Sequence, residues 1–398
     1  MDRNKALLVY SGWLGDFVWI VPAIKALRRQ FKSLSIVVSD VQGPLALGLE
    51  GTQVDKVFVG SRADRSAAAR RIRSDAIDAD IGTFIDIKGR GKAGLFIPWH
   101  RSAAVFMPDR RDAREYLLAR LLHPFAANLP PRDTTQHMVD SYLGIARFFG
   151  VEKPTVDFEL SFPEKVAAEA DAIAEKEGLR TGKTVAISPG SAQFSKIWPA
   201  ANYRALADIL QGDMGCKVVI MGARSFGPNG NYDLDVSRRY FGDGKFVNLV
   251  ERTDILVDSC LFQSGVFDVA AGNDSFAGHM AGSATEKPAG TAGAVAAPDG
   301  RCFTANLTVS LFGPTNPRFC RPYDPTGEFN SIVRPDKYPD DCPYNRDDHV
   351  CVHYGDKTCI GGNHCMNAIT VDQVVRTVEQ QLEKARRRGK PGRKQIGI

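Results

Sequence analysis

The chain has 398 residues, too many for one ordinary hydrophobic core, so we expect two domains of roughly 150–200 residues. Hydrophobic residues make up 43% and charged residues 24%, which is typical of a globular protein, and no run of about 18 apolar residues indicates a membrane span. The short apolar run 6–14 is followed by Gly15-Asp16 rather than a small-residue cleavage site, so we expect a cytoplasmic protein.

The net charge of +5 has its origin at the carboxyl end, where seven Lys and Arg residues and no acid lie between Lys384 and Ile398. All seven follow Leu382, the last apolar position of a predicted terminal helix, so we expect them to lie outside the catalytic fold. Two interpretations are open: a solvated terminus, or peripheral association with an anionic membrane. No aromatic-interleaved basic motif accompanies them, so nucleic acid is not an expected partner.

Strands and helices alternate in the first domain, which we place at 1–160. Apolar, β-branched runs predict its strands at 5–10, 34–38, 56–59 and 83–87. Apolar residues at helical spacing predict its helices at 18–31, 110–122 and 135–149. The alternation is typical of an α/β fold with a doubly wound parallel sheet.

A second alternation fills residues 161–369, after a Pro-containing connection. Its predicted strands are 184–187, 217–221, 265–270 and 307–311, and its predicted helices include 164–177 and 200–210. Residues 284–305 are rich in Ala and Gly and predict an inserted surface loop. An amphipathic helix is expected at 370–388 and a basic tail at 389–398.

Three loops of small residues follow strands of this second domain directly: 188–199, 273–279 and 312–315. Carboxyl ends of parallel strands meet at one sheet edge, which is where open α/β domains bind ligands. Glycine and serine allow close approach to a phosphate, and Lys196, Asp274 and His279 supply the polar groups that an anionic nucleotide needs.

The order of these motifs along the chain is specific. It runs Gly15-Asp16 before a helix, Pro189-Gly-Ser with Lys196-Ile-Trp-Pro199, Asn273-Asp-Ser with His279, Phe312-Gly-Pro-Thr315, and Cys365-Met with Ile369. This order resembles glycosyltransferase family 9, the ADP-heptose:lipopolysaccharide heptosyltransferases. The resemblance implies a GT-B fold, in which two Rossmann-like domains face each other across a cleft, with the nucleotide-sugar donor on the second domain and the acceptor against the first.

The resemblance also implies an activity. It is inverting, metal-independent transfer of heptose from ADP-heptose to a hydroxyl of a lipopolysaccharide-core or related glycan or protein acceptor, a step of lipopolysaccharide biosynthesis without a cofactor. Asp16 would be the general base, with a helix N-cap as the alternative. Lys196 would offset the charge of the departing diphosphate, with a plain surface lysine as the alternative.

Donor contacts are implied for the same three loops. The residues are Gly190, Ser191, Asp274, Ser275, His279, Gly313 and Thr315. By resemblance, the Asp274 carboxylate would bind sugar hydroxyls and Ser275 a phosphate. For His279, a structural role in holding its loop is an open alternative.

Two departures from the family pattern flank this expected donor site. Phe276 stands where the family usually has glycine, and the insertion 284–305 separates the loop of Asp274 from the strand that leads to Phe312. Transfer of a different nucleotide sugar by the same fold therefore stays open.

Basic residues crowd the stretch 88–114 of the first domain, among them Arg90 and Lys92, which we take as acceptor contacts. Arginine binds carboxylates and phosphates well, so the expected acceptor is an anionic glycan or glycolipid. A solvated basic face is the alternative.

Cysteine and histidine cluster near the carboxyl end. The residues are Cys342, Cys351, Cys359 and Cys365, with His349, His353 and His364. In a reducing compartment this density is compatible with a structural metal, although no C-x-x-C pair is present, and plain thiols are the alternative.

Two other classes of protein fit the sequence less well. A Rossmann dehydrogenase is disfavoured because Gly12-Trp-Leu-Gly15 is not the G-x-G-x-x-G fingerprint. A non-catalytic binding protein of the same fold would be expected to lack the general base, but Asp16 is present.

Overall fold

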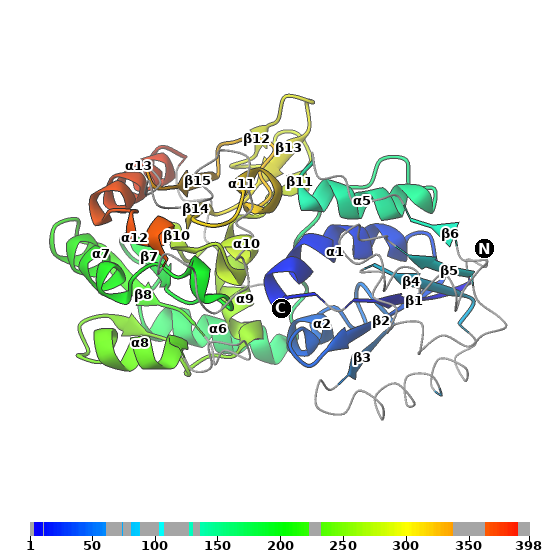
Figure 1. The fold of residues 1–398 in the computed structure, drawn as a ribbon, viewed down its shortest axis with the longest axis horizontal. Coiled ribbons are helices and arrows are strands. Elements are labelled where there is room, and N and C mark those ends of the chain that lie inside the picture. The colour runs from blue at the N-terminus through cyan, green and yellow to red at the C-terminus, as the bar shows by residue number, and fades with distance from the viewer. Residues whose placement is uncertain are drawn as a thin grey trace. The chain divides into compact units, whose positions relative to one another are not determined.

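The structure is a computed structural model that describes residues 4–10, 12–60, 74, 81–87, 103–106, 127–129, 136–222, 232–336 and 363–388. The chain divides into two compact units, Met1–Ser161 and Phe162–Ile398 (Figure 1). The division lies one residue after the boundary proposed from the Pro-containing connection. Each unit is built around its own parallel sheet.

The first unit holds a six-stranded sheet of order β3-β2-β1-β4-β5-β6. Its strands are β1 Lys5–Val9, β2 Ser33–Ser39, β3 Lys56–Gly60, β4 Thr83–Asp86, β5 Ala103–Phe106 and β6 Ala127–Asn128. All neighbours pair in parallel. This is the Rossmann order, and the connections change direction between β1 and β4, where such sheets bind ligands.

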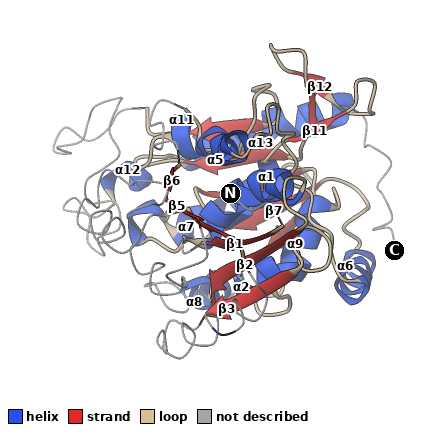
Figure 2. Cartoon of the chain, turned by 90° about the vertical axis from the view of Figure 1, so that its right-hand side faces the viewer, coloured by secondary structure: helices blue, strands red, loops and turns tan. Residues whose placement is uncertain are grey.

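Three helices of the first unit are described: α1 Leu14–Arg28, α2 Gly43–Leu47 and α5 Met138–Phe148. Helices α1 and α5 lie side by side (Figure 2). Helix α1 begins at Leu14 rather than at 18, because β1 ends at Val9 and a short turn suffices to start it. Pro22 therefore lies inside the helix and removes one backbone donor, a cost that burial of Phe17, Ile20 and Ile24 offsets. The helix expected at 110–122 lies outside the described residues.

The second unit repeats the same topology. Its six-stranded parallel sheet has the order β15-β14-β10-β7-β8-β9, which is the Rossmann order again when its strands are counted along the chain. The strands are β7 Thr184–Ser188, β8 Lys217–Ile220, β9 Val247–Asn248, β10 Val269–Asn273, β14 Leu307–Leu311 and β15 Asn330–Val333. Its switch point lies between β7 and β10.

Strand β10 corrects the predicted strand 265–270. Gly265 has a φ of 72°, so the chain still turns at this point. Val266 and Phe267 are buried in that turn, at 1% and 4% exposure, and they extend the apolar run before the strand begins. Because these buried residues precede the strand, the predicted strand began four residues before β10.

The second unit contains eight described α-helices, and several of them pack in two separate groups. The helices are α6 Glu164–Lys176, α7 Ala200–Gly212, α8 Tyr232–Phe241, α9 Ile255–Gln263, α10 Phe276–Gly282, α11 Pro317–Cys320, α12 His364–Asn367 and α13 Val371–Arg388. Helix α7 packs with α8 and α13, whereas α9 packs with α6 and α10. Among the described helices, none is both long and apolar enough to cross a membrane.

The composition of the insertion 284–305 predicted a surface loop, but the insertion contains three strands. It forms a three-stranded antiparallel sheet of β11 Thr285–Lys287, β13 Cys302–Thr304 and β12 Val295–Ala296, with β13 in the middle. Phe303 of β13 is fully buried, and the Arg301 guanidinium lies 5.2 Å from the centre of its ring. Phe303 is the one aromatic side chain that anchors this small sheet. The Ala- and Gly-rich residues around it give no strand pattern, so the sequence did not predict the sheet.

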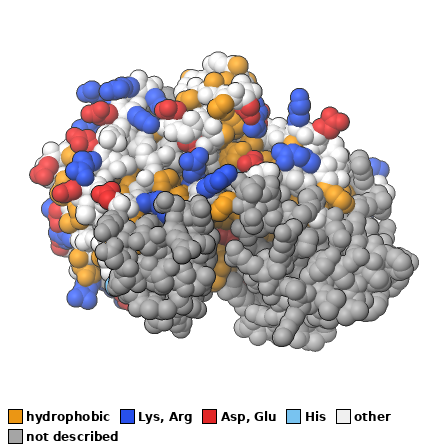
Figure 3. Space-filling model, turned by 45° about the horizontal axis from the view of Figure 1, so that its top comes forward, with side chains coloured by type: hydrophobic (Ala, Val, Ile, Leu, Met, Phe, Trp, Pro, Cys, Tyr) orange, Lys and Arg blue, Asp and Glu red, His pale blue; other side chains and the backbone are white. Residues whose placement is uncertain are grey.

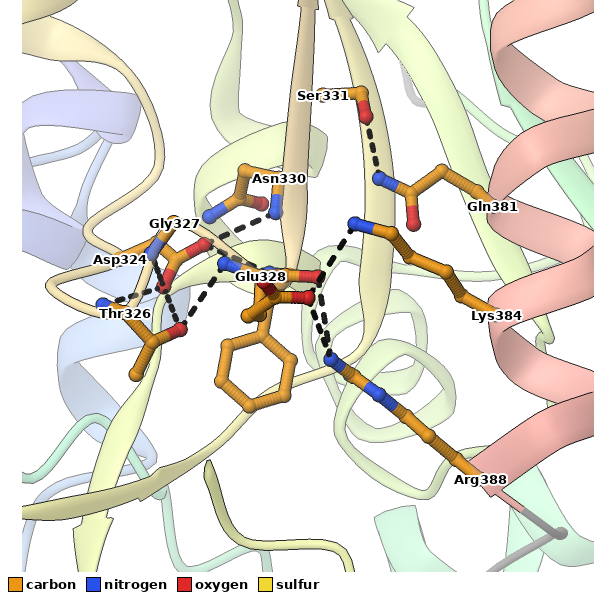
Figure 4. Close-up of polar contacts among 10 residues, drawn as sticks. Asp324, Thr326, Gly327, Glu328, Asn330, Ser331, Gln381, Lys384 and Arg388 are labelled. Carbon is orange, nitrogen blue, oxygen red and sulfur yellow. Dashed lines mark hydrogen bonds and ion pairs between the residues drawn. The ribbon is translucent and has the colours of Figure 1, made fainter. Parts of the chain in front are cut away.

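Helix α13 is fastened by its basic end to the turn that precedes β15 (Figure 4). Gln381 donates to Ser331 Oγ, and Lys384 Nζ lies 3.5 Å from Glu328 Oε2. Arg388 lies 3.7 Å from the same carboxylate, and its guanidinium is 4.7 Å from the ring centre of buried Phe329. The expectation that the basic residues lie outside the fold is therefore wrong for Lys384 and Arg388.

The exposed side of α13 carries both signs of charge. Its exposed residues include Asp372, Arg376, Glu379, Glu383, Arg386 and Arg387. Figure 3 likewise shows acidic and basic side chains interspersed on the coloured face. This helix therefore presents no uniformly basic surface.

Truncation after Glu383 is expected to destabilise the second unit, because it removes both cations at Glu328 and the cover of the Phe329 ring. The expected loss is about 1–2 kcal/mol, seen as a melting temperature lower by a few degrees. Truncation after Arg388 keeps these contacts and serves as the control. Equal melting temperatures for the two truncations would contradict the assignment.

Candidate functional site

Three loops meet at the carboxyl edge of the second sheet, as the sequence predicted. They follow the neighbouring strands β7, β10 and β14, and they are named here by residue: the Lys196 loop (189–198), the Asp274 loop (274–279) and the Thr315 loop (312–315). Gly272 pairs with Ser188 and Asn273 with Leu311, so the loops start at the same level of the sheet. They therefore surround the switch point between β7 and β10.

The Asp274 carboxylate joins all three loops. Its Oδ2 atom lies 2.6 Å from Lys196 Nζ and accepts a 2.7 Å hydrogen bond from Thr315 Oγ1. Its Oδ1 atom faces His279 Nε2 at 3.4 Å, a long contact without hydrogen-bond geometry, so within the described residues Oδ1 accepts no hydrogen bond. The side chain is 1% exposed, whereas that of Lys196 is 12% exposed.

Two opposing effects act on the pKa of Asp274. Complete burial raises it, because the charged form loses its hydration. The Lys196 ammonium acts in the opposite direction, with a smaller effect from His279, and the pKa of Asp274 ends well below its usual range. The carboxylate is therefore ionised at neutral pH, and it serves as the counterion of Lys196.

The Lys196 loop is held at both ends by Asn273, a fully buried residue at the end of β10. The Asn273 side chain accepts from the backbone N–H of Trp198 at 3.0 Å and donates to the carbonyl of Pro189 at 2.6 Å. Trp198 is itself fully buried, and its ring N–H donates to the Ile369 carbonyl. The buried Trp198 ring therefore anchors the carboxyl end of the loop by packing.

The remaining donor candidates fall into two groups. Gly190, Ser191 and Ser275 are half-buried at the edge of the sheet, with Ser275 directly before α10. Thr315 and His279 are buried against Asp274. Gly313 is buried too, and a Cβ built on it would lie 2.5 Å from Met366 Sδ, so close packing by itself explains this glycine.

In the first unit, Asp16 lies in the first turn of α1, half-buried, at the carboxyl edge of β1. Trp13 occupies the N-cap position, so the alternative that Asp16 is the N-cap is wrong. The turn before it is held by buried Gln42, which donates to the Gly12 carbonyl and accepts from the Ser39 N–H. The carboxylate sits where a helix dipole favours negative charge.

Several predicted residues lie outside the described ranges. They are Arg90, Lys92, Cys342, Cys351, Cys359, His349 and His353. Cys365 is buried in α12 next to Gly313. In the part of the chain that the structure describes, no three His, Cys, Asp or Glu side chains group as a metal site would require.

The sequence reasoning missed the role of Asn273. The sequence contained a signal for this role, because Asn273 is a polar amide at the end of an apolar strand. A side chain buried at such a position must find hydrogen-bond partners. The sequence also assigned Asp274 to the substrate, whereas the structure turns its oxygens toward Lys196, Thr315 and His279.

Two parallel sheets of Rossmann order define the α/β fold of GT-B glycosyltransferases. Residues 118–288 match the model of glycosyltransferase family 9 (heptosyltransferase), the family that the motifs resemble, and this match supports a glycosyltransferase. No protein with a curated description matches this sequence.

Solved structures of similar fold cover nearly the whole chain. A family 9 glycosyltransferase of Veillonella parvula is 19% identical with a TM-score of 0.69, covering 96% of this chain and 98% of that one. The E. coli heptosyltransferase WaaC with ADP is 16% identical, with a TM-score of 0.62 and coverage of 95% and 99%. The E. coli ADP-heptose lps heptosyltransferase II is 15% identical, with a TM-score of 0.63 and coverage of 96% and 99%. At such identities the likeness establishes the fold.

Neutralising Asp274 is expected to destabilise the second unit, because the largely buried Lys196 ammonium then loses the charge of the carboxylate that lies 2.6 Å from it. Asp274→Asn should cost about 3 kcal/mol at pH 7, and adding Lys196→Met should recover part of the loss. Because the folded pKa of Asp274 is lowered, its stabilising effect is complete above the unfolded pKa of about 3.9 and is lost as pH falls toward the folded pKa. The difference from wild type should therefore shrink below about pH 4.

Urea unfolding at pH 7 and below pH 4 measures both effects. The four proteins are wild type, Asp274→Asn, Asp274→Asn/Lys196→Met and Asp208→Asn. Asp208 is the matched control, because its carboxylate is 38% exposed beside Arg204, and Asp208→Asn should cost less than about 1 kcal/mol. Equal stabilities of Asp274→Asn and wild type at pH 7 would contradict the buried pair.

Proposed function

We propose that the protein is an inverting glycosyltransferase that moves heptose from ADP-heptose to a hydroxyl of a lipopolysaccharide-core or related glycan or protein acceptor. The observation that carries this proposal is the Lys196–Asp274 pair at the switch point of the second sheet. A lysine ammonium beside a buried carboxylate, at the edge where α/β sheets bind nucleotides, suits a diphosphate. The family description as heptosyltransferase supports heptose as the sugar.

The proposed reaction needs one base and one cation. Asp16 takes the proton of the acceptor hydroxyl, and the oxygen attacks the anomeric carbon as the bond from that carbon to the diphosphate breaks. The electron pair of the broken bond leaves with ADP, and Lys196 offsets the added negative charge. Because a lysine supplies this charge, the proposal requires no metal ion in the chemical step.

The other site residues take supporting roles in this scheme. Gly190, Ser191 and Ser275 line the half-buried edge and would contact phosphate or sugar oxygens. Asp274, His279 and Thr315 form an inner layer that holds Lys196. Gly313 would allow close packing beneath them, and Arg90 and Lys92 would bind the anionic glycan or glycolipid acceptor.

A second candidate is transfer of another nucleotide sugar by the same fold. Phe276 is the first residue of α10, directly after Ser275, and is half-buried there. The β11–β13 sheet, by contrast, leads into the amino end of β14, on the sheet edge opposite the three loops, so this candidate rests on Phe276. A bulky ring directly after Ser275 gives a physical reason for altered sugar selection.

We propose a cytoplasmic location, with peripheral binding to the inner face of the inner membrane as an added property. The bases for the membrane contact are Arg386 and Arg387, both exposed, and the basic stretch 389–398. Each basic residue near an anionic leaflet contributes about 1 kcal/mol, screened by salt.

The donor is tested by calorimetric binding of ADP-heptose, other ADP-sugars, UDP-sugars and GDP-sugars to the wild-type protein. ADP-heptose should bind most tightly, and Lys196→Ala should weaken its binding by about tenfold or more, since a charge-assisted contact is lost. Lys183→Ala, an exposed lysine of the same unit, is the control and should bind as wild type does. Preference for another sugar nucleotide would favour the second candidate, and binding without turnover would favour a non-catalytic protein.

Asp16→Asn is expected to reduce turnover by roughly 10²–10⁴ while leaving donor binding intact, because only proton removal is impaired. Asp40→Asn is the matched control, an exposed carboxylate that follows β2 at the same sheet edge. Steady-state kinetics with a core-oligosaccharide acceptor measures the effect, with and without EDTA. Wild-type turnover in Asp16→Asn would refute the base, and EDTA-dependent loss restored by Mg²⁺ would refute the metal-free step.

A further inference from the structure

The amide of Asn273 uses both of its polar atoms on the Lys196 loop and its flanks. Its Oδ1 accepts from Trp198 N–H at 3.0 Å and from Tyr203 hydroxyl at 2.8 Å. Its Nδ2 donates to the carbonyls of Pro189 at 2.6 Å and Gly190 at 3.4 Å. One fully buried side chain thus bonds the first residues of the loop, its last residue and helix α7.

These bonds close the loop from a rigid base. Asn273 is the last residue of β10, a central strand that pairs in parallel with both β7 and β14. The loop that it closes contains a short 3₁₀ turn, Phe194–Lys196, with its own bond from Lys196 N–H to the Gln193 carbonyl. Lys196 therefore projects from a segment whose two ends share one buried anchor.

The next residue along the chain completes the arrangement. Asp274 follows Asn273 directly and places its carboxylate 2.6 Å from Lys196 Nζ. The carboxylate acts on the lysine by charge, whereas the amide acts on the loop backbone. Consecutive residues at the end of one strand therefore fix the position of the Lys196 backbone and that of its ammonium group.

We propose that Asn273 is a positioning residue for Lys196: it sets the loop so that the ammonium meets the diphosphate of the donor. The inference rests on the proposed nucleotide-sugar site. It assigns to Asn273 no contact with substrate. Small misplacements of a charged group at a reaction site cost one to two orders of magnitude, so the effect should be measurable in binding.

The chain offers a matched control in Asn330, a buried asparagine of the same sheet at the start of β15. Its Nδ2 donates to the carbonyls of Gly282 at 3.0 Å and Pro322 at 3.4 Å, and its Oδ1 contacts Thr308 Oγ1 (its setting is drawn in Figure 4). It lies at the amino end of its strand, on the sheet edge opposite the three loops. Loss of Asn330 should therefore lower stability without touching Lys196.

The experiment measures ADP binding by calorimetry and melting temperature for a set of variants. The set is wild type, Asn273→Ala, Asn330→Ala, Lys196→Ala and the double variant Asn273→Ala/Lys196→Ala. We expect Asn273→Ala to weaken ADP binding by about tenfold. The double variant should bind no more weakly than Lys196→Ala, because Asn273 acts only through the lysine. Asn330→Ala should melt lower and bind ADP as wild type does.

A milder variant covers the case in which Asn273→Ala does not fold. Tyr203→Phe removes only the hydroxyl that donates to Asn273 and should weaken ADP binding by about threefold, with the same lack of additivity toward Lys196→Ala. Wild-type affinity in Asn273→Ala or, where that variant fails to fold, in Tyr203→Phe overturns the inference, as does an effect that adds fully to that of Lys196→Ala. If wild type and Asn330→Ala bind neither ADP nor any ADP-sugar, the proposed function fails first and the inference with it.

Discussion

Burial of the Asp274 carboxylate is the constraint on which the second unit's site depends. A carboxylate removed from water is strongly destabilising unless a cation and hydrogen-bond donors surround it. Lys196 and Thr315 meet this need from two different loops, and His279 approaches from a third direction. The three loops are therefore tied to one point, and a lysine that could otherwise extend into solvent is kept at the sheet edge.

The parallel sheet makes this convergence possible. Strands β7, β10 and β14 are neighbours, so residues that are far apart in the chain leave the sheet at the same level. Asn273 and Asp274, at the end of β10, have different roles. The amide satisfies backbone groups of the Lys196 loop, which would otherwise be buried without partners, and the carboxylate satisfies the charge of the lysine.

The terminal part of the chain supports the same loops from outside the sheet. The Trp198 ring donates to the Ile369 carbonyl, just before α13, and Gly313 packs against Met366 of α12. Helix α13 continues this contact across α7 and β14, and its basic end binds Glu328. The amphipathic helix expected at 370–388 is thus part of the framework that holds the site, and so are Lys384 and Arg388 of its basic end.

The local pattern of the sequence determined much of this protein. Apolar, β-branched runs separated by helical periods predicted both parallel sheets, because buried strands and amphipathic helices leave these periods in any chain. Small residues directly after three strands predicted the edge at which the site lies, since the carboxyl ends of parallel strands must coincide. The positions of Lys196 and Asp274 were found in this way, whereas Asp16 was indicated by the family resemblance.

Other features were decided by tertiary contacts that no local pattern records. Whether Asp274 faces a substrate or a lysine depends on which loop lies opposite, and the structure places Lys196 there. The four bonds of Asn273 join residues that are up to 84 positions apart. Apolar residues buried in a turn made the predicted strand start before β10 does. Phe303 anchors a small sheet in an insertion that is otherwise rich in Ala and Gly. Each outcome depends on long-range burial, which determines where a polar or aromatic side chain finds its partner only once the chain is folded.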